Sequence, residues 1–261
     1  MKNPAVNPGD QVAILLKEIE SKKYFLDHSV LPTLDSLGHM KVRLLNDSDA
    51  HEVQALRTKV LSTLEHPDHY RPELEAANFV DNHLKLNTGI MVGLTDRGSL
   101  VSYCTLTLIN DRHPAWQALA RSTQESHQAI AFYSSAMVIP QYRGRGLHHA
   151  MIRLRHALCE HLGLINRIAT ISPENWRSWE NFSMNSMPLC AVVEYENGAK
   201  RLVAKYETDM KTFGLCQEEK IVDLQDHNVL KELFLKGMHL VECRVINGRE
   251  FGVFVQSGHP Q

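Results

Sequence analysis

Two glycines and two arginines lie between a short apolar run and an amphipathic stretch in VIPQYRGRGLHHA, residues 138–150. Gly144 and Gly146 let the backbone turn tightly and approach a ligand without a Cβ in the way. A helix that begins at Leu147 leaves its first amides without partners inside the helix, and the positive end of its dipole points back into the loop. This arrangement predicts a binding site for an anion.

The two arginines narrow the prediction to a pyrophosphate. Arg143 and Arg145 add two full positive charges beside the helix start. Other phosphate motifs fit worse, because the Gly-Lys-Ser/Thr of a P-loop is absent and His149 stands where a dinucleotide fingerprint has its third glycine. Arg-Gly runs also occur in RNA-binding segments, but this one is isolated between a predicted strand and a predicted helix.

Hydrophobic periodicity predicts the elements that position this loop. Strands are expected, in order, over 41–46, 89–96, 99–109, 129–140 and 167–172, followed by a hairpin that turns at Asn197-Gly198. Helices are expected over 47–64, 73–85, 147–162 and 173–187, the last with Ser172 as its N-cap and Pro173 at its first position. Hairpins alternate with a crossover, which predicts a mixed sheet.

Residues 218–256 show the same order again: strand, helix, and a hairpin that turns at Asn247-Gly248. In this comparison Asn228 matches Asn175. The segment is either a true partial repeat or a second, unrelated copy of a common motif.

The expected fold class is α/β (α+β): a mixed, mostly antiparallel central sheet flanked by helices, with this strand–helix–hairpin repeat at the C-terminus. The expected domains are a helical extension (1–40), a core (41–210) and the partial repeat (211–261).

Composition excludes several classes of function. The 261 residues carry a net charge of −2, which gives no electrostatic reason to expect nucleic acid or an anionic membrane as partner. No stretch approaches the ~20 apolar residues of a membrane helix, and the start has no signal-peptide core. The five scattered cysteines lack metal-type spacing and indicate reduced thiols. We therefore expect a cytoplasmic protein without a metal.

The loop and its helix resemble the acyl-coenzyme A binding motif of the Gcn5-related N-acetyltransferases (GNAT). That family's pattern is Arg/Gln-x-x-Gly-x-Gly/Ala after a strand ending Val-x-Pro, which Val138-Ile139-Pro140 supplies here. In the register set by this strand end, the pattern falls on Arg143, Gly146 and His148, where the family has Gly or Ala at the last position. A second, literal match uses Gln141, Gly144 and Gly146. The resemblance covers residues 41–208 and implies an acyl-CoA N-acyltransferase fold.

The resemblance implies acetyl-coenzyme A as the cofactor. Backbone groups of Met137 and Val138 would hydrogen-bond the pantetheine arm, and Asn175 would contact it or frame its thiol end. The pyrophosphate would be held by the amides of the loop and the helix start: Arg143, Gly144, Arg145, Gly146, Leu147 and His148.

The resemblance also implies direct attack of an amine on the thioester, which needs a group that protonates the leaving thiolate. Many family members place a tyrosine for this purpose seven residues after the helix asparagine. Here that residue is Phe182, which has no proton to donate. Ser183, next to it, or a water is then the expected source.

The group that accepts the amine proton is open. No carboxylate lies on the strand over 131–139, so Tyr133, Ser134 and Ser135 are the candidates to relay the proton through water. Glu125 is the nearest ordinary base, together with His127, although both also fit a solvated loop.

The leading hypothesis is an N-acyltransferase that moves an acetyl group from acetyl-CoA to an amine. The alternative is a catalytically silent acyl-CoA-binding sensor, since Phe182 and the missing strand carboxylate leave the proton transfers without assigned groups. The acceptor is expected to be a small-molecule or peptide amine, with no nucleic acid and no membrane as partner, and a homodimer is the assembly considered.

Overall fold

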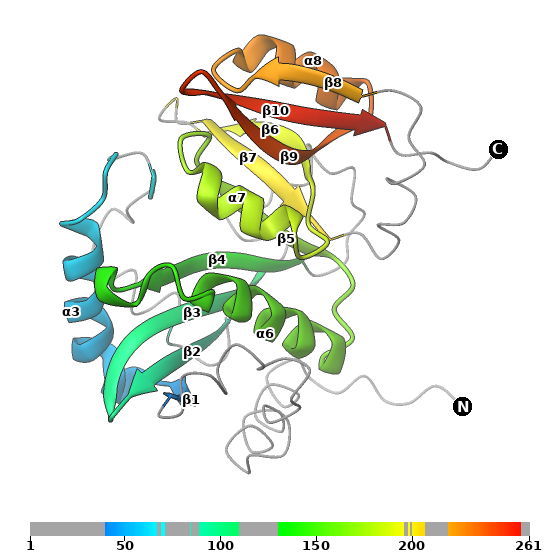
Figure 1. Cartoon of the computed structure of the whole chain (residues 1–261). Coiled ribbons are helices and arrows are strands. Elements are labelled where there is room, and N and C mark those ends of the chain that lie inside the picture. Colours follow the sequence, from blue (N-terminus) through cyan, green and yellow to red (C-terminus); the bar gives the residue numbers. More distant parts are fainter. Residues whose placement is uncertain are drawn as a thin grey trace, which may run out of the picture. The chain divides into compact units, whose positions relative to one another are not determined.

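The computed structural model describes residues 40–66, 69–70, 84, 89–109, 130–195, 198, 200–206 and 219–256 (Figure 1). The chain divides into two units: the first comprises Met1–Leu64, Pro72–Leu108 and Ala131–Ile165, and the second comprises Glu65–Arg71, Ile109–Ile130 and Asn166–Gln261. The expected extension over 1–40 lies outside the described residues apart from Met40, and the expected helix over 73–85 lies outside them apart from Leu84. Within the described part, no helix has the length and apolar character to span a membrane.

The first unit contains a four-stranded antiparallel sheet. Its strands, in spatial order, are β1 (Met40–Leu45), β2 (Gly89–Asp96), β3 (Ser99–Ile109) and β4 (Ile130–Val138). The pairs β1–β2 and β2–β3 are antiparallel. Contacts between β3 and β4 also run in opposite directions, because Ile139 N donates to Val101 O while Thr105 Oγ1 donates to Ser135 O.

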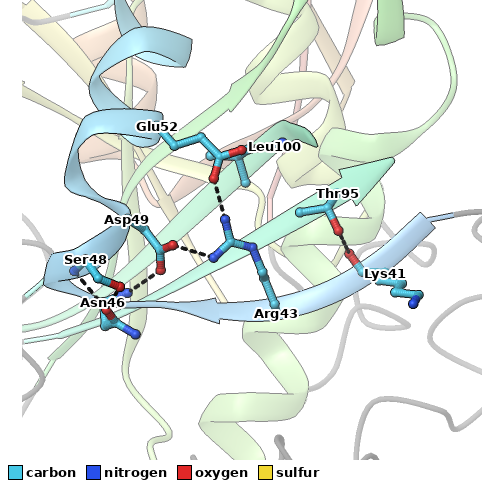
Figure 2. A network of polar contacts seen from close by, with 8 residues as sticks. All are labelled: Lys41, Arg43, Asn46, Ser48, Asp49, Glu52, Thr95 and Leu100. Carbon is cyan, nitrogen blue, oxygen red and sulfur yellow. Dashed lines mark hydrogen bonds and ion pairs between the residues drawn. The ribbon is translucent and has the colours of Figure 1, made fainter. Parts of the chain in front are cut away.

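Two helices pack against this sheet, and polar contacts fix the first of them. The helical segments are η1 (Asp47–Asp49), α3 (Ala50–Leu61), η3 (Pro140–Tyr142) and α6 (Leu147–His161). Figure 2 shows Arg43 of β1 donating to the carboxylates of Asp49 and Glu52. Glu52 also accepts from the backbone N of Leu100 at 2.8 Å, so one carboxylate ties α3 to both β1 and β3.

Helix α6 begins at Leu147, as predicted, and its apolar stripe faces the sheet. The buried members of the stripe are Leu147, Ala150, Met151, Leu154 and Leu158. Arg155 reaches from α6 to both central strands: its guanidinium donates to Thr105 O at 3.5 Å and lies 4.5 Å from the ring centre of Tyr133. The helix therefore packs on β3 and β4 and holds its N-terminus at the end of β4.

The second unit is a six-stranded sheet in which every neighbouring pair is antiparallel. The spatial order is β5 (Arg167–Ile171), β7 (Lys200–Lys205), β6 (Leu189–Glu194), β9 (Met238–Ile246), β10 (Arg249–Gln256) and β8 (Glu219–Asp223). Its helices are α7 (Trp176–Ser183) and α8 (His227–Leu235). With the first unit, this confirms the predicted mixed α/β class with a mostly antiparallel sheet.

The segment β8–α8–β9–β10 is a structural repeat of β5–α7–β6–β7. The N-caps Asn175 and Asp226 lie 51 residues apart, and each accepts at 3.2 Å from the amide three residues on, Ser178 or Val229. The turn that precedes each cap is also repeated, with the side chains of Ser172 and Asp223 accepting from the amide two residues later.

Both hairpins of the repeat carry the same irregularity. The register of β6 against β7 shifts between Leu189 and Ala191, and that of β9 against β10 shifts opposite Leu240 and Glu242, again 51 residues later. Where the repeats meet, Leu189 pairs with Leu240. When a residue pairs with its own equivalent in the other repeat, a local twofold axis passes between the two. The strand order β5-β7-β6-β9-β10-β8 has the same symmetry, so the second unit has internal pseudo-twofold symmetry (Figure 1).

Two details of the sequence prediction are wrong. Helix α7 begins at Trp176 with Asn175 as its cap, three residues later than Ser172 and Pro173 suggested. The Ser172 hydroxyl is engaged in the turn before the helix, so it cannot reach a helical amide. The match of Asn228 with Asn175 is wrong for a related reason: the residue in the cap position of α8 is Asp226.

The predicted domain boundaries at 40 and 210 stay a proposal. Residues 207–218 lie outside the described residues, and the two observed units divide the expected core after α6.

Candidate anion and acyl-CoA site

The loop between β4 and α6 has the backbone form of an anion cradle. Gly144 and Gly146 both have a φ of 73°, the left-handed region that favours glycine, and Gly146 is the N-cap of α6. The first helical hydrogen bond runs from Ala150 N to Gly146 O at 3.0 Å. The three amides before Ala150 therefore precede the ladder and point toward the loop. No acidic side chain lies in the first turn to compete for them.

Both arginines of the loop are exposed. Arg143 bridges two elements, since its Nε donates to Val138 O at 3.4 Å and its Nη2 to Thr63 Oγ1 at 3.2 Å. Arg145 lies over the ring of Tyr142, 4.8 Å from its centre. The Tyr142 hydroxyl in turn donates to the Asp96 carboxylate at the end of β2. These contacts anchor the loop while its charges stay accessible to an anion.

His148 is the departure from the family pattern, and its charge state follows from its surroundings. The side chain is partly buried in the first turn of α6. Burial lowers its pKa to about 3, with the nearby Arg155 as a second cause. His148 is therefore neutral at physiological pH, and the positive charge of the cradle comes from the arginines and the helix dipole.

The free energy of unfolding is expected to fall as the pH drops below about 6.5. His148 and His239 have folded-state pKa values of about 3 and about 4, lowered mainly by burial. Below the unfolded pKa of about 6.5, the unfolded chain binds protons that the folded chain refuses, which favours unfolding. Each histidine contributes up to about 1.4 kcal/mol per pH unit in this window. Urea unfolding at pH 7.5, 6.0 and 5.0 measures the slope.

Substitution separates these histidines from the rest of the protein. His148→Gln and His239→Gln should each flatten the pH dependence. An equal free energy of unfolding at pH 7.5 and 5.0 in the unmodified protein would contradict the prediction.

Burial alternates along the second half of β4. Ser134, Ala136 and Val138 are partly exposed, while Ser135 and Met137 are buried. These three partly exposed positions form an open strip along β4 that leads to the anion cradle. The carbonyls of Met137 and Val138 already accept from Ser102 Oγ and Arg143 Nε. A pantetheine arm on this strip would share those carbonyls or use strand amides.

Tyr133 and Ser135, two catalytic candidates, are engaged in the core. Tyr133 is 3% exposed, and its hydroxyl lies 2.9 Å from His156 Nδ1 on α6. Ser135 is 4% exposed, with its Oγ 3.4 Å from the Tyr103 hydroxyl. Their catalytic roles stay predictions, and the observed contacts give both residues a packing role.

The remaining candidates belong to the second unit. The Asn175 side chain is occupied at both ends: Oδ1 accepts from Ser178 N, and Nδ2 lies 3.5 Å from His69 O. Phe182 and Ser183 lie on the buried side of α7, at 4% and 6% exposure. Among the described residues, Ser183 Oγ has no hydrogen-bond partner.

That hydroxyl and the indole N–H of Trp179 are the buried side-chain polar groups of α7 that have no hydrogen-bond partner in the described part of the chain. The residue equivalent to Ser183 in the repeat is Phe234, an ordinary core residue. A buried hydroxyl without a partner is costly, about 1–3 kcal/mol. The role of Ser183 stays a prediction. Glu125 and His127 lie outside the described residues.

The sequence analysis missed two polar residues of the first unit. Thr105 and Thr107 of β3 each place Oγ1 2.7 Å from Ser134 Oγ. Their signal was the alternation Thr-Leu-Thr in an otherwise apolar strand, since alternate residues share a face.

Comparison with known proteins identifies similar structures but no similar sequence family. No family model and no curated protein matches the sequence. The chain is similar to an N-acetyltransferase from Staphylococcus aureus Mu50, with 14% identity, a TM-score of 0.47, and 64% of this chain and 97% of that one covered. It is also similar to the ribosomal-protein-S18-alanine N-acetyltransferase from Escherichia coli, with 14% identity and a TM-score of 0.44. This match covers 66% of this chain and 95% of that one.

A third similar structure is an acetyltransferase of the GNAT family from Streptococcus pneumoniae, at 13% identity and a TM-score of 0.45, covering 64% of this chain and 99% of that one.

Proposed function

We propose that the protein transfers an acetyl group from acetyl-CoA to an amine. The observation that carries the proposal is the cradle between β4 and α6, which combines two left-handed glycines, a helix start without a side-chain cap and two exposed arginines within four residues. Each of these features favours the binding of a pyrophosphate. A turn or a helix cap alone would not need all of them.

In the proposed reaction, acetyl-CoA supplies the thioester and the chain supplies its placement. The amine nitrogen attacks the carbonyl carbon, a C–N bond forms, the C–S bond breaks, the amine loses a proton and the thiolate gains one. Amides of Met137 and Val138 hold the arm, and the loop from Arg143 to His148 holds the pyrophosphate. Phe182 cannot protonate the thiolate, so Ser183 or a water does.

A sensor that binds acyl-CoA without turnover is the second candidate. It is favoured by the buried positions of Tyr133 and Ser135, which place two of the predicted proton relays in the core. Release of free thiol from acetyl-CoA in the presence of an amine panel separates the two, because a sensor binds the cofactor and releases none.

The acceptor class, the location and the assembly are parts of the same proposal. The acceptor is a small-molecule or peptide amine, and the protein is cytoplasmic. A homodimer would use a surface other than the edge of β6 that faces away from β7, because β9 already pairs with that edge.

Gly144→Glu is expected to weaken acetyl-CoA binding at least tenfold. The substitution places a carboxylate in the cradle, where it repels the pyrophosphate. A Cβ at Gly144 would meet open space, with no atom within 4 Å, although the φ of 73° strains any side chain there. Calorimetric titration with acetyl-CoA measures the change.

Gly144→Gln is the matched control, because it carries the same strain and nearly the same shape without the charge. Its affinity should fall much less than that of the glutamate variant. Equal affinities for wild type, Gly144→Gln and Gly144→Glu, all folded by circular dichroism, would refute the cofactor site.

A further inference from the structure

Three hydroxyls form a connected group between β3 and β4. Ser134 Oγ lies 2.7 Å from both Thr105 Oγ1 and Thr107 Oγ1. Thr105 Oγ1 also donates to the backbone carbonyl of Ser135 at 3.2 Å. The two threonines are 1% and 5% exposed, whereas Ser134 is partly exposed at the open strip of β4.

Counting protons gives this group a direction. A hydroxyl has one proton and two lone pairs. All three contacts are hydrogen bonds only if the proton of Thr105 goes to the Ser135 carbonyl and the proton of Ser134 goes to Thr105. The proton of Ser134 is then used, and Thr107 must donate to Ser134. One lone pair of Ser134 Oγ is left, and it can only accept a hydrogen bond.

This direction argues against a proton relay. The chain runs from Thr107 through Ser134 and Thr105 to a backbone carbonyl, and none of these groups is a base at physiological pH. A proton that entered at Ser134 would have nowhere to go. The arrangement suits a fixed acceptor for a donor on a ligand.

The position of Ser134 matches the far end of a ligand that starts at the cradle. Ser134 and Val138 lie at the two ends of the open strip, four residues or about 13 Å apart at 3.3 Å per residue. Between them, Ala136 adds an apolar side chain. Ser134 is therefore the polar group that a ligand lying along this strip meets last.

We propose that Ser134 positions the acceptor amine by accepting one of its N–H groups, and that Thr105 holds the Ser134 hydroxyl in the accepting orientation. This inference rests on the proposed acetyl transfer. Thr105 acts through Ser134, whereas Thr107 donates to it and contributes less to its orientation.

Two isosteric variants test the direction of the chain. Thr105→Val removes the acceptor of the Ser134 proton. The Ser134 O–H can then point toward the amine, where it opposes the amine N–H. The KM for the amine should therefore rise about tenfold. Thr107→Val leaves Ser134 donating to Thr105, and its effect on the same KM should be several times smaller. Thr105→Ser keeps the hydroxyl and should restore most of the loss. Ser134→Ala should raise KM about as much as Thr105→Val.

The probes are tyramine, spermidine and a short peptide with N-terminal alanine, with acetyl-CoA affinity and thermal unfolding measured for each variant. The pH profile of kcat/KM should keep its shape in Ser134→Ala, because no base is removed. Equal effects of Thr105→Val and Thr107→Val would overturn the inference, as they would indicate a structural role. So would a loss of acetyl-CoA affinity without a change in the amine KM, which would make Ser134 a cofactor contact.

If the wild type binds acetyl-CoA but acetylates none of the probes, the proposed function fails separately. Calorimetry of the same probes on the CoA-loaded protein then decides the inference. Weaker binding in Ser134→Ala supports it, and unchanged or undetectable binding overturns it.

Discussion

Deletion of residues 219–261 is expected to abolish soluble, cooperative folding. The deletion removes β9, which pairs with β6 and packs against α7, and so exposes a strand edge in the middle of the second unit. Leu189, which is 0% exposed, would lose its partner Leu240. An open, apolar strand edge pairs readily with other chains, so aggregation is the expected result.

Size-exclusion chromatography with light scattering and near-ultraviolet circular dichroism measure this outcome. A shorter deletion, of residues 257–261 only, is the control, because it stops after the last residue of β10. A monomeric, cooperatively folded protein without residues 219–261 would contradict the prediction and would make the repeat a separate module.

Trp179→Ala and Leu230→Ala are each expected to lower the free energy of unfolding by about 3 kcal/mol. The two residues occupy equivalent positions of α7 and α8, 51 residues apart, and both are 0% exposed. Each helix contacts the central strand of the other repeat, α7 on β9 and α8 on β6. A cavity on either side of the axis therefore weakens the same core, and each variant should still unfold in one transition.

The repeat offers its own control positions. Met184 and Leu235, also equivalent, are 69% and 79% exposed. Their replacement by alanine should change the free energy of unfolding by less than about 0.5 kcal/mol. Urea unfolding followed by both circular dichroism and fluorescence measures all four variants. Two separate transitions in Leu230→Ala would show that the repeats unfold independently.

The pseudo-twofold axis changes how the C-terminal repeat is understood. From sequence, this segment was either a true partial repeat or a second, unrelated copy of a common motif. In the structure its first strand, helix and hairpin reproduce β5–α7–β6–β7 down to the caps and the shift in register. It continues the sheet beside β6 and contributes to the core of the second unit.

Local patterns in the sequence determined most elements of the fold. Alternating apolar residues predicted the strands, and the Asn247-Gly248 turn formed with positive φ at both residues. The glycine positions of the loop were also readable, because Gly144 and Gly146 adopt a backbone conformation that other residues rarely take. These features depend on a few neighbouring residues, so the sequence alone is sufficient for them.

Other features depended on contacts that no local pattern encodes. The cap of α7 is Asn175 and not Ser172, because the turn after β5 uses the serine hydroxyl first. The hydrogen-bonded hydroxyls of Thr105, Thr107 and Ser134 belong to residues about 30 apart in sequence. The donor-to-acceptor direction of their hydrogen bonds follows from one backbone carbonyl, that of Ser135. Strand pairing brought these atoms to 2.7 Å, and burial set the neutral state of His148. The sequence thus determined where the anion loop lies, and the tertiary structure decided which side chains are available to a ligand beside it, because availability depends on which hydrogen bonds and buried surfaces the folded core has already used.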